Sequence, residues 1–214
     1  MARKVFLLQV LLFLFASFLP AYAHAQRQVG IAMTDEGAGG FYMAVRDYFD
    51  VPEREVIVIK EKKMRDEEIP VVFFIARRAR VPYLTVVNLR LSGMSWIEIA
   101  LKYGLTPDVF YVPGVVVTGP PYGRAYGYYR NKPRHKWKTI ILTDGEVIDL
   151  VNLRFISEHY RYPADKVVRM RGDGKSFVII DHEIRREIGQ EVRKGKEERP
   201  QHRGKKERGR DEER

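Results

Sequence analysis

The residues best suited to chemistry in this 214-residue chain lie in one stretch, where tyrosines alternate with arginines and lysines. No Asp or Glu occurs between Val109 and Thr143, and this span contains GPPYGRAYGYYRNKPRHKWK. Aromatic faces can stack on sugar rings or bases, and cationic side chains pair with phosphate or carboxylate groups. The stretch predicts an anion- or polymer-binding surface made of Arg124, Tyr126, Tyr128, Tyr129, Arg130, Lys132, Arg134 and Lys136. The alternative is a linker whose tyrosines pack inward and whose charges are only solvated.

Other reactive groups do not form a recognisable site. No Gly-x-Ser-x-Gly nucleophile motif is present. Two acid pairs stand where apolar helices are expected to begin, and the helix dipole favours negative charge there: Glu67/Glu68 and Asp144/Glu146. In Asp181-His182-Glu183, neighbouring side chains on a helix point in different directions, so a metal ion would need ligands from elsewhere. We therefore predict no catalytic residues, no metal site and no cofactor.

The chain has no cysteine. This composition excludes disulfides, thiol catalysis, cysteine zinc sites and the lipid-accepting cysteine of a bacterial lipoprotein.

The N-terminus has the three parts of an export signal. Arg3 and Lys4 are followed by an almost wholly apolar run from Val5 to Leu19 and then by Ala23-His24-Ala25, a small–x–small cleavage pattern. The apolar run is short for a membrane-spanning helix, which needs about 20 residues. We expect cleavage before Gln26 and a periplasmic or secreted product, with an uncleaved anchor as the alternative.

The formal net charge is +10 at pH 7. A basic exported protein would be attracted to acidic envelope polymers, to anionic lipid head groups and, less favourably, to nucleic acid. The alternative is that the charge only maintains solubility.

An internal repeat determines the expected architecture. The segment PYLTVVNLRLSGMSW, residues 82–96, aligns without a gap on PADKVVRMRGDGKSF, residues 163–177, and each copy follows an apolar helix with an acidic start. The repeat predicts three-helix units in which proline starts the second helix, glycine ends it, serine caps the third helix and an aromatic ring fills the joint. The residues in these roles are Pro82, Arg90, Gly93, Ser95 and Trp96 in one copy, and Pro163, Arg171, Gly174, Ser176 and Phe177 in the other.

The stretch GMSWIEIALKYGL, residues 93–105, is typical of a helix-turn-helix motif. A recognition helix needs exposed side chains that reach base edges, and this one offers only Glu98 and Lys102. We therefore expect a packing unit, with a nucleic-acid binder as the alternative.

At this point the chain resembles exported bacterial proteins of unassigned function. These carry an apolar helix, Arg-x-x-Gly-x-Ser-Trp, an Ile-Ala…Gly ending and a Gly/Pro/Tyr segment; here the resemblance covers roughly residues 41–188. It implies no activity. The second copy departs from it after Phe177, where VIIDHEIRREI is β-branched, so its third helix is expected to be short or partly replaced by a strand. Val56–Ile59 is equally open between strand and helix.

The sequence as a whole predicts a mainly α protein of two related helical units. The expected parts are a signal peptide (1–25), a flexible leader (26–40), an N-terminal helical unit (41–111), a basic Tyr/Gly/Pro loop without regular structure (112–138), a C-terminal helical unit (139–192) and a disordered charged tail (193–214). The expected function is non-catalytic binding or scaffolding in the bacterial cell envelope. The alternatives are a nucleic-acid binder and an enzyme with a site between the two units.

Overall fold

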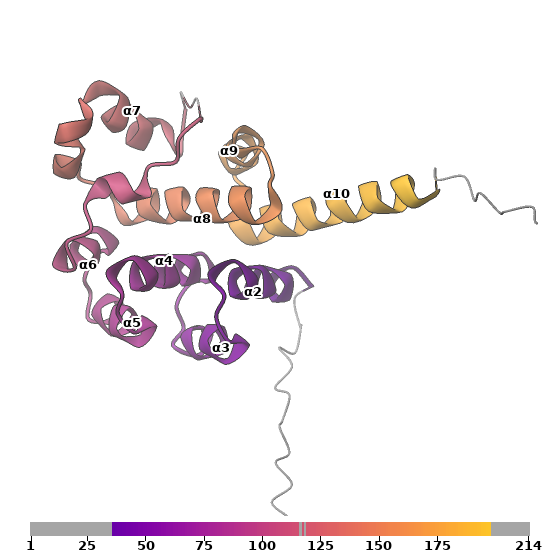
Figure 1. Ribbon diagram of the computed structural model, residues 1–214, viewed down its shortest axis with the longest axis horizontal. Helices are drawn as coiled ribbons and strands as arrows, with labels where there is room; N and C mark the ends of the chain where they lie inside the picture. Colours follow the sequence, from indigo (N-terminus) through magenta and orange to yellow (C-terminus); the bar gives the residue numbers. More distant parts are fainter. Residues whose placement is uncertain (1–35, 116, 118, 198–214) are drawn as a thin grey trace, which may run out of the picture. The chain divides into compact units, whose positions relative to one another are not determined.

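The chain folds into α-helices joined by short turns (Figure 1). The computed structural model describes residues 36–197 except 116 and 118, and these residues contain no strand. The predicted mainly α class is confirmed. The elements are α2 (Glu36–Phe49), α3 (Glu53–Glu61), η1 (Asp66–Glu68), α4 (Ile69–Ala79), α5 (Tyr83–Leu91), α6 (Trp96–Lys102), η2 (Pro107–Phe110), α7 (Gly123–Asn131), η3 (Arg134–Thr139), α8 (Asp144–Tyr160), α9 (Ala164–Gly172) and α10 (Phe177–Glu197). The expected signal peptide lies outside the described residues.

Helices α4 and α8 form the centre of the packing. Every residue from Ile69 to Ala76 is buried, and so is almost every residue from Glu146 to Ile156. A helix that is apolar on all sides needs neighbours on all sides. Accordingly, α4 packs on α8, α5 packs on α4, and α9 packs on α8.

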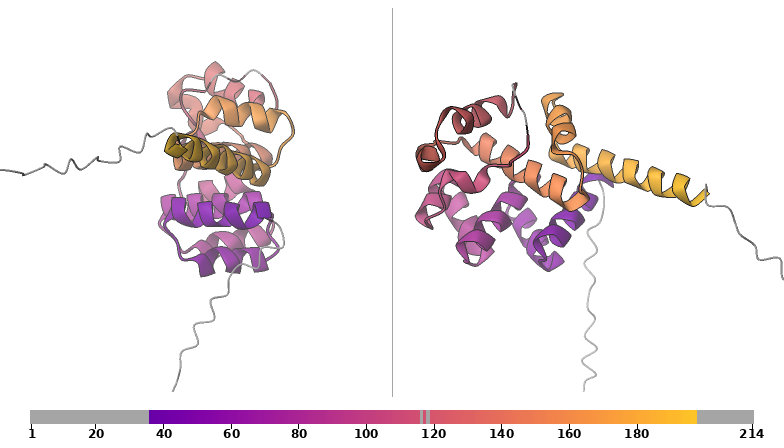
Figure 2. Two further views of the ribbon diagram at one scale, coloured as in Figure 1. Left: turned by 90° about the vertical axis from the view of Figure 1, so that its right-hand side faces the viewer. Right: turned by 45° about the horizontal axis from the view of Figure 1, so that its top comes forward.

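Helix α2 packs along α10, although α10 lies at the other end of the described sequence (Figure 2). The prediction of a flexible leader over 26–40 is wrong from Glu36 onward, because EGAGG forms the first turns of α2. Gly39 and Gly40 are buried, and a Cβ on Gly40 would lie 2.1 Å from the guanidinium carbon of Arg185 on α10. Gly40 thus leaves room for the end of the Arg185 side chain, a contact that local sequence cannot reveal.

The two copies of the repeat have the same backbone geometry. The glycines that end α5 and α9, Gly93 and Gly174, have φ of 95° and 87°. The residue after each glycine donates to the carbonyl five positions earlier, at 3.3 Å in both copies. Pro82 and Pro163 stand one position earlier than expected, as N-caps in extended conformation, so the helix starts at the following residue.

A third copy precedes these two and was missed in the sequence. Pro52 caps α3 as Pro82 and Pro163 cap α5 and α9. Asp50, Arg80 and Arg161, each two residues before such a proline, all have positive φ, of 52°, 56° and 51°. Lys63, with φ of 58°, occupies the place of the repeat glycine. The copy was concealed because a lysine holds a left-handed position that usually selects glycine.

The two segments left open between strand and helix are both helical. Val56–Ile59 lies within α3, and Val178–Ile180 lies within α10. The expectation of a short or strand-like third helix in the second copy is wrong, since α10 has 21 residues. Its buried positions, Phe177, Ile180 and Ile184, follow helical spacing against α2, so tertiary packing overrides β-branching. The helix also extends past the expected tail boundary at 193 to Glu197; residues 198–214 lie outside the described part.

Candidate functional site

The basic tyrosine stretch is a folded segment, and the prediction of a loop without regular elements over 112–138 is wrong. Helix α7 begins after the Pro120-Pro121 pair, where the Gly123 amide donates to the Gly119 carbonyl at 2.7 Å. It ends before Lys132, which is extended because the next residue is Pro133. The 3-10 helix η3 follows.

An aromatic pocket of about 370 Å³ lies between α7, η3 and the segment after η2. It is lined by Tyr111, Val115, Val117, Tyr126, Tyr129, Arg130, Arg134 and Trp137. The Tyr111 ring lies 4.7 Å from the Trp137 ring and 5.0 Å from the Tyr129 ring, centroid to centroid. These rings form one continuous aromatic wall, and we call this cavity the aromatic pocket.

The polar atoms of the aromatic wall donate hydrogen bonds to nearby backbone carbonyls and so hold the rings in place. The Tyr126 hydroxyl donates to the Val112 carbonyl at 2.9 Å, and the Tyr129 hydroxyl donates to the Pro107 carbonyl at 2.6 Å. The Trp137 indole N–H donates to the Tyr129 and Lys132 carbonyls. Burial raises the pKa of both Tyr126 and Tyr129, so both stay neutral donors. A ligand would therefore meet ring faces and guanidinium groups rather than these hydroxyls.

Two exposed arginines stand at the rim of the aromatic pocket. Arg130 closes α7, and Arg134 opens η3 with its guanidinium 5.4 Å from the Trp137 ring centroid. Neither arginine makes a salt bridge with any residue that the structure describes. The rim therefore offers two cations, held by short elements, for an acidic ligand.

The eight candidate residues divide into two groups. The structure places Tyr126, Tyr129, Arg130 and Arg134 on the aromatic pocket. It places the other four, Arg124, Tyr128, Lys132 and Lys136, away from the pocket lining. Arg124 donates to the Tyr128 hydroxyl at 2.9 Å and lies 3.2 Å from the Glu146 carboxylate. The expected single surface is thus a pocket plus a separate flank.

Sequence reasoning missed half of the pocket lining. Trp137 lies within the same acid-free stretch and could have been included by composition alone. Tyr111 is an aromatic residue of the same stretch and was also left out, whereas Val115 and Val117 carry neither a charge nor an aromatic ring and gave no comparable signal.

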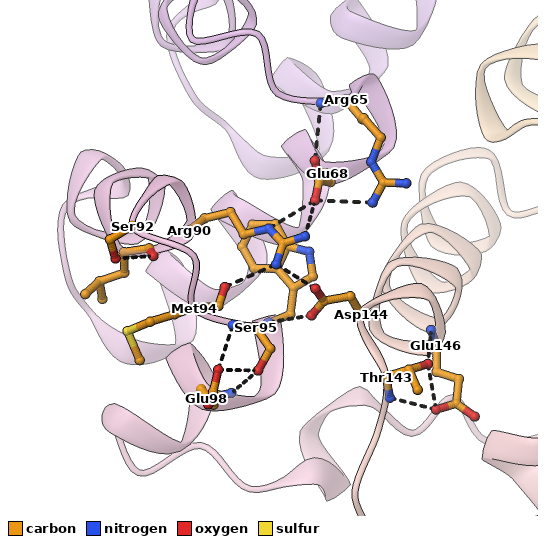
Figure 3. Close-up of polar contacts among 12 residues, drawn as sticks. Arg65, Glu68, Arg90, Ser92, Met94, Ser95, Glu98, Thr143, Asp144 and Glu146 are labelled. Carbon is orange, nitrogen blue, oxygen red and sulfur yellow. Dashed lines mark hydrogen bonds and ion pairs between the residues drawn. The ribbon is translucent and has the colours of Figure 1, made fainter.

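The repeat arginines form two partly buried ionic clusters. In the first (Figure 3), the Arg90 guanidinium donates to Glu68 at 2.8 Å, to Asp144 at 2.6 Å and to the Met94 carbonyl at 3.1 Å. It also lies 4.7 Å from the Trp96 ring centroid. Burial alone would raise the pKa of Glu68, but hydrogen bonds from Arg65 and Arg90 outweigh burial and lower it.

The second cluster repeats this geometry around Arg171. Its guanidinium donates to Asp149 and to the Lys175 carbonyl, both at 3.0 Å, and lies 4.9 Å from the Phe177 ring centroid. Arginine and partner acid are separated by 22 residues along the chain in both clusters, Glu68–Arg90 and Asp149–Arg171.

Each of the two copies that contain α5 and α9 also supplies an acid that caps the third helix of the other. The Trp96 amide at the start of α6 donates to Asp144 at 2.7 Å, and the Phe177 amide at the start of α10 donates to Glu67 at 2.7 Å. The reciprocal caps tie the two units together. They also give the acids at the starts of α4 and α8 a specific role, which the helix dipole alone does not.

The remaining carboxylates at the helix starts make structural hydrogen bonds. Ser95 caps α6 through a capping box with Glu98, and Thr143 caps α8 through one with Glu146 (Figure 3). Asp149 differs in that burial raises its pKa to about 6, against the opposing effect of Arg171. Within residues 36–197, apart from the two gaps, no group of three His, Cys, Asp or Glu side chains is placed to hold a metal ion.

The helix-turn-helix segment is packed as expected of a structural unit. Trp96, Ile99 and Ala100 are buried, whereas Glu98, Leu101 and Lys102 are exposed. The exposed face thus offers one cation and an acid already engaged by Ser95, with no Arg, Asn or Gln.

The comparisons with known proteins give no family for this chain. No family model matches it, no curated protein is similar to it in sequence, and no solved structure matches its fold. Among the described helices, none combines the length and apolar character needed to cross a bilayer.

Proposed function

We propose that this chain is an exported, non-catalytic binding or scaffolding protein of the bacterial cell envelope that holds acidic polymers in the aromatic pocket. The observation that carries the proposal is the combination of the Tyr111–Tyr129–Trp137 wall with the exposed guanidinium groups of Arg130 and Arg134. Support for export comes from the N-terminal pattern that ends at Ala23-His24-Ala25.

The pocket chemistry suits one ring of a charged polymer. Its volume of about 370 Å³ is near the lower end for ligand pockets, so it accommodates a single ring rather than a folded ligand. Aromatic faces pack against the C–H face of a sugar ring, and a guanidinium at the rim pairs with a carboxylate or phosphate on that ring.

The binding test separates ring contacts from charge. Retention on heparin, lipopolysaccharide and DNA is measured against salt concentration for the chain, for R130Q/R134Q and for Tyr111→Leu. Neutralising the arginines should flatten the salt dependence, because fewer counterions are displaced on binding. Removing the Tyr111 ring should weaken retention at every salt concentration. The proposal fails if both variants are retained like the parent chain.

Two controls accompany this test. R193Q/K194Q removes the same amount of charge from exposed positions on α10, and a chain ending at Glu197 lacks the basic tail. Retention should survive both changes. If removal of the tail alone abolishes retention on all three matrices, the aromatic pocket does not bind these polymers.

Export is tested separately. Cell fractionation and mass analysis should find a species that starts at Gln26 outside the inner membrane. A cytosolic species that retains Met1 would refute the location while leaving the pocket measurement intact.

A further inference from the structure

A second cavity, separate from the aromatic pocket, is surrounded by three arginines. It has a volume of about 310 Å³ and is lined by Tyr48, Phe49, Phe74, Arg77, Arg78, Arg154 and Glu158. Its lining comes from α2, α4 and α8, which pack on one another around the aromatic residues. We call this cavity the arginine pocket.

The charges of the arginine pocket do not balance. Three arginines face one carboxylate, Glu158, which accepts a hydrogen bond from the Tyr48 hydroxyl at 2.5 Å and lies 3.8 Å from Arg154. Arg77 and Arg78 make no salt bridge with any described residue. Burial, and then the nearby charge of Arg154, lower the pKa of Arg78. An anion in the pocket would relieve this repulsion.

Arg154 is held in place beside the cavity by backbone carbonyls. Its Nη2 donates to the Tyr111 carbonyl at 2.6 Å and to the Val109 carbonyl at 3.3 Å, so the guanidinium is fixed. Its Nε is fully buried and has no hydrogen-bond partner among the described residues, so this atom lies behind the wall of the pocket. Arg154 therefore contributes a positive charge of fixed position to the cavity.

The position of the cations is only partly explained by the helices that carry them. Arg77 and Arg78 lie in the last turn of α4, where the helix dipole favours positive charge. Arg154 lies in the interior of α8, where its guanidinium also holds the Val109 and Tyr111 carbonyls. The convergence of all three side chains on one cavity is what points to an anionic ligand.

We propose that the arginine pocket binds the phosphate monoester of a small organic molecule. Arg77, Arg78 and Arg154 hold the phosphate, and the rings of Phe49 and Phe74 contact the organic group. Three arginines line the cavity with one glutamate, and Asp108 also lies close enough to act on Arg78, so at least one positive charge is unbalanced. A phosphate monoester supplies about −1.5 to −2 at pH 7. Guanidinium groups match phosphate oxygens in pairs. The small volume favours a small ligand over a macromolecule.

Calorimetric titration with phenyl phosphate tests this site. The chain should bind one equivalent, and R77Q/R78Q should bind at least tenfold more weakly. Both substitutions are at exposed side chains, whereas Arg154 also bonds two backbone carbonyls and is left unchanged. The matched control, R193Q/K194Q, removes the same charge from exposed positions on α10 that line neither pocket, and should bind phenyl phosphate like the parent chain.

Three ligand comparisons identify the recognised group. Phenol should not bind, and inorganic phosphate should bind more weakly than phenyl phosphate because it has no ring for Phe49 and Phe74. Equal affinity for inorganic phosphate would overturn the organic part of the proposal. Stronger binding to vesicles containing phosphatidic acid than to phenyl phosphate would assign the pocket to a lipid head group instead. Equal losses in the two double variants, or no saturable binding at millimolar concentration, would overturn the site itself.

Discussion

Trp96 provides a sharp test of how the repeat is held together. Its side chain is fully buried at the start of α6, with the Arg90 guanidinium 4.7 Å from the ring centroid. Its indole N–H is buried and has no partner. The residue thus combines a large favourable burial with one unfavourable polar group, and the two contributions can be separated by substitution.

The expected magnitudes follow from those contacts. Truncating a buried aromatic residue to alanine costs about 3–5 kcal/mol, and an unsatisfied buried donor costs about 1–3 kcal/mol. Trp96→Ala removes both, so its loss of stability should lie near the lower limit, about 3 kcal/mol. Trp96→Phe keeps a six-membered ring under Arg90 and removes the unsatisfied donor together with part of the buried ring system. These two effects oppose each other, so the variant should stay within about 1 kcal/mol of the parent chain.

Phe177 is the matched control, because it occupies the equivalent place in the second copy and has no polar atom. Phe177→Ala should therefore lose at least as much stability as Trp96→Ala. Urea unfolding followed by far-ultraviolet circular dichroism gives the three free energies. An unchanged midpoint for Trp96→Ala would refute the burial argument. A loss in Trp96→Phe as large as in Trp96→Ala would refute the assignment of an unsatisfied N–H.

Three further predictions concern the turns, a buried acid and the aromatic pocket. Gly93→Ala and Gly174→Ala should each lower the free energy of unfolding by about 1–2 kcal/mol in urea titrations, purely from positive φ, because an added Cβ meets nothing within 4 Å at either glycine. The folded-state pKa of Asp149 is raised from 3.8 to about 6, so protonation of this carboxyl favours the folded state. As the pH falls from 7.5 to 4, the free energy of unfolding of the parent chain should rise by about 2–3 kcal/mol relative to Asp149→Asn. A difference that does not change with pH would contradict this. Tyr129→Phe should cost about 1–3 kcal/mol in thermal or urea unfolding, because the Pro107 carbonyl loses its 2.6 Å hydrogen bond; a neutral result would show that water replaces it.

The sequence by itself determined the mainly α class and much of the local geometry of the repeat. The roles of Gly93 and Ser95 follow from backbone rules that act over a few residues: a left-handed position selects glycine, and a serine oxygen satisfies a free amide at a helix start. Such rules are visible in one sequence because cause and effect are neighbours along the chain. The same rules failed for Lys63, where a lysine adopts the left-handed conformation and concealed the third copy.

The tertiary structure alone decided which distant residues meet. EGAGG was expected to be flexible because glycine favours an unfolded chain, yet α10 covers it. Asp144 and Glu67 were interpreted as acids at helix starts, but each caps a helix of the other copy, a contact that spans 48 and 110 residues respectively. The two pockets arise in the same way: packing of α7, η3 and the segment after η2 forms the aromatic pocket, and packing of α2, α4 and α8 forms the arginine pocket. Periodicity and capping specify a helix and its ends, whereas the partner of a buried face depends on the shape of the whole core, and one sequence does not encode that shape in any local pattern.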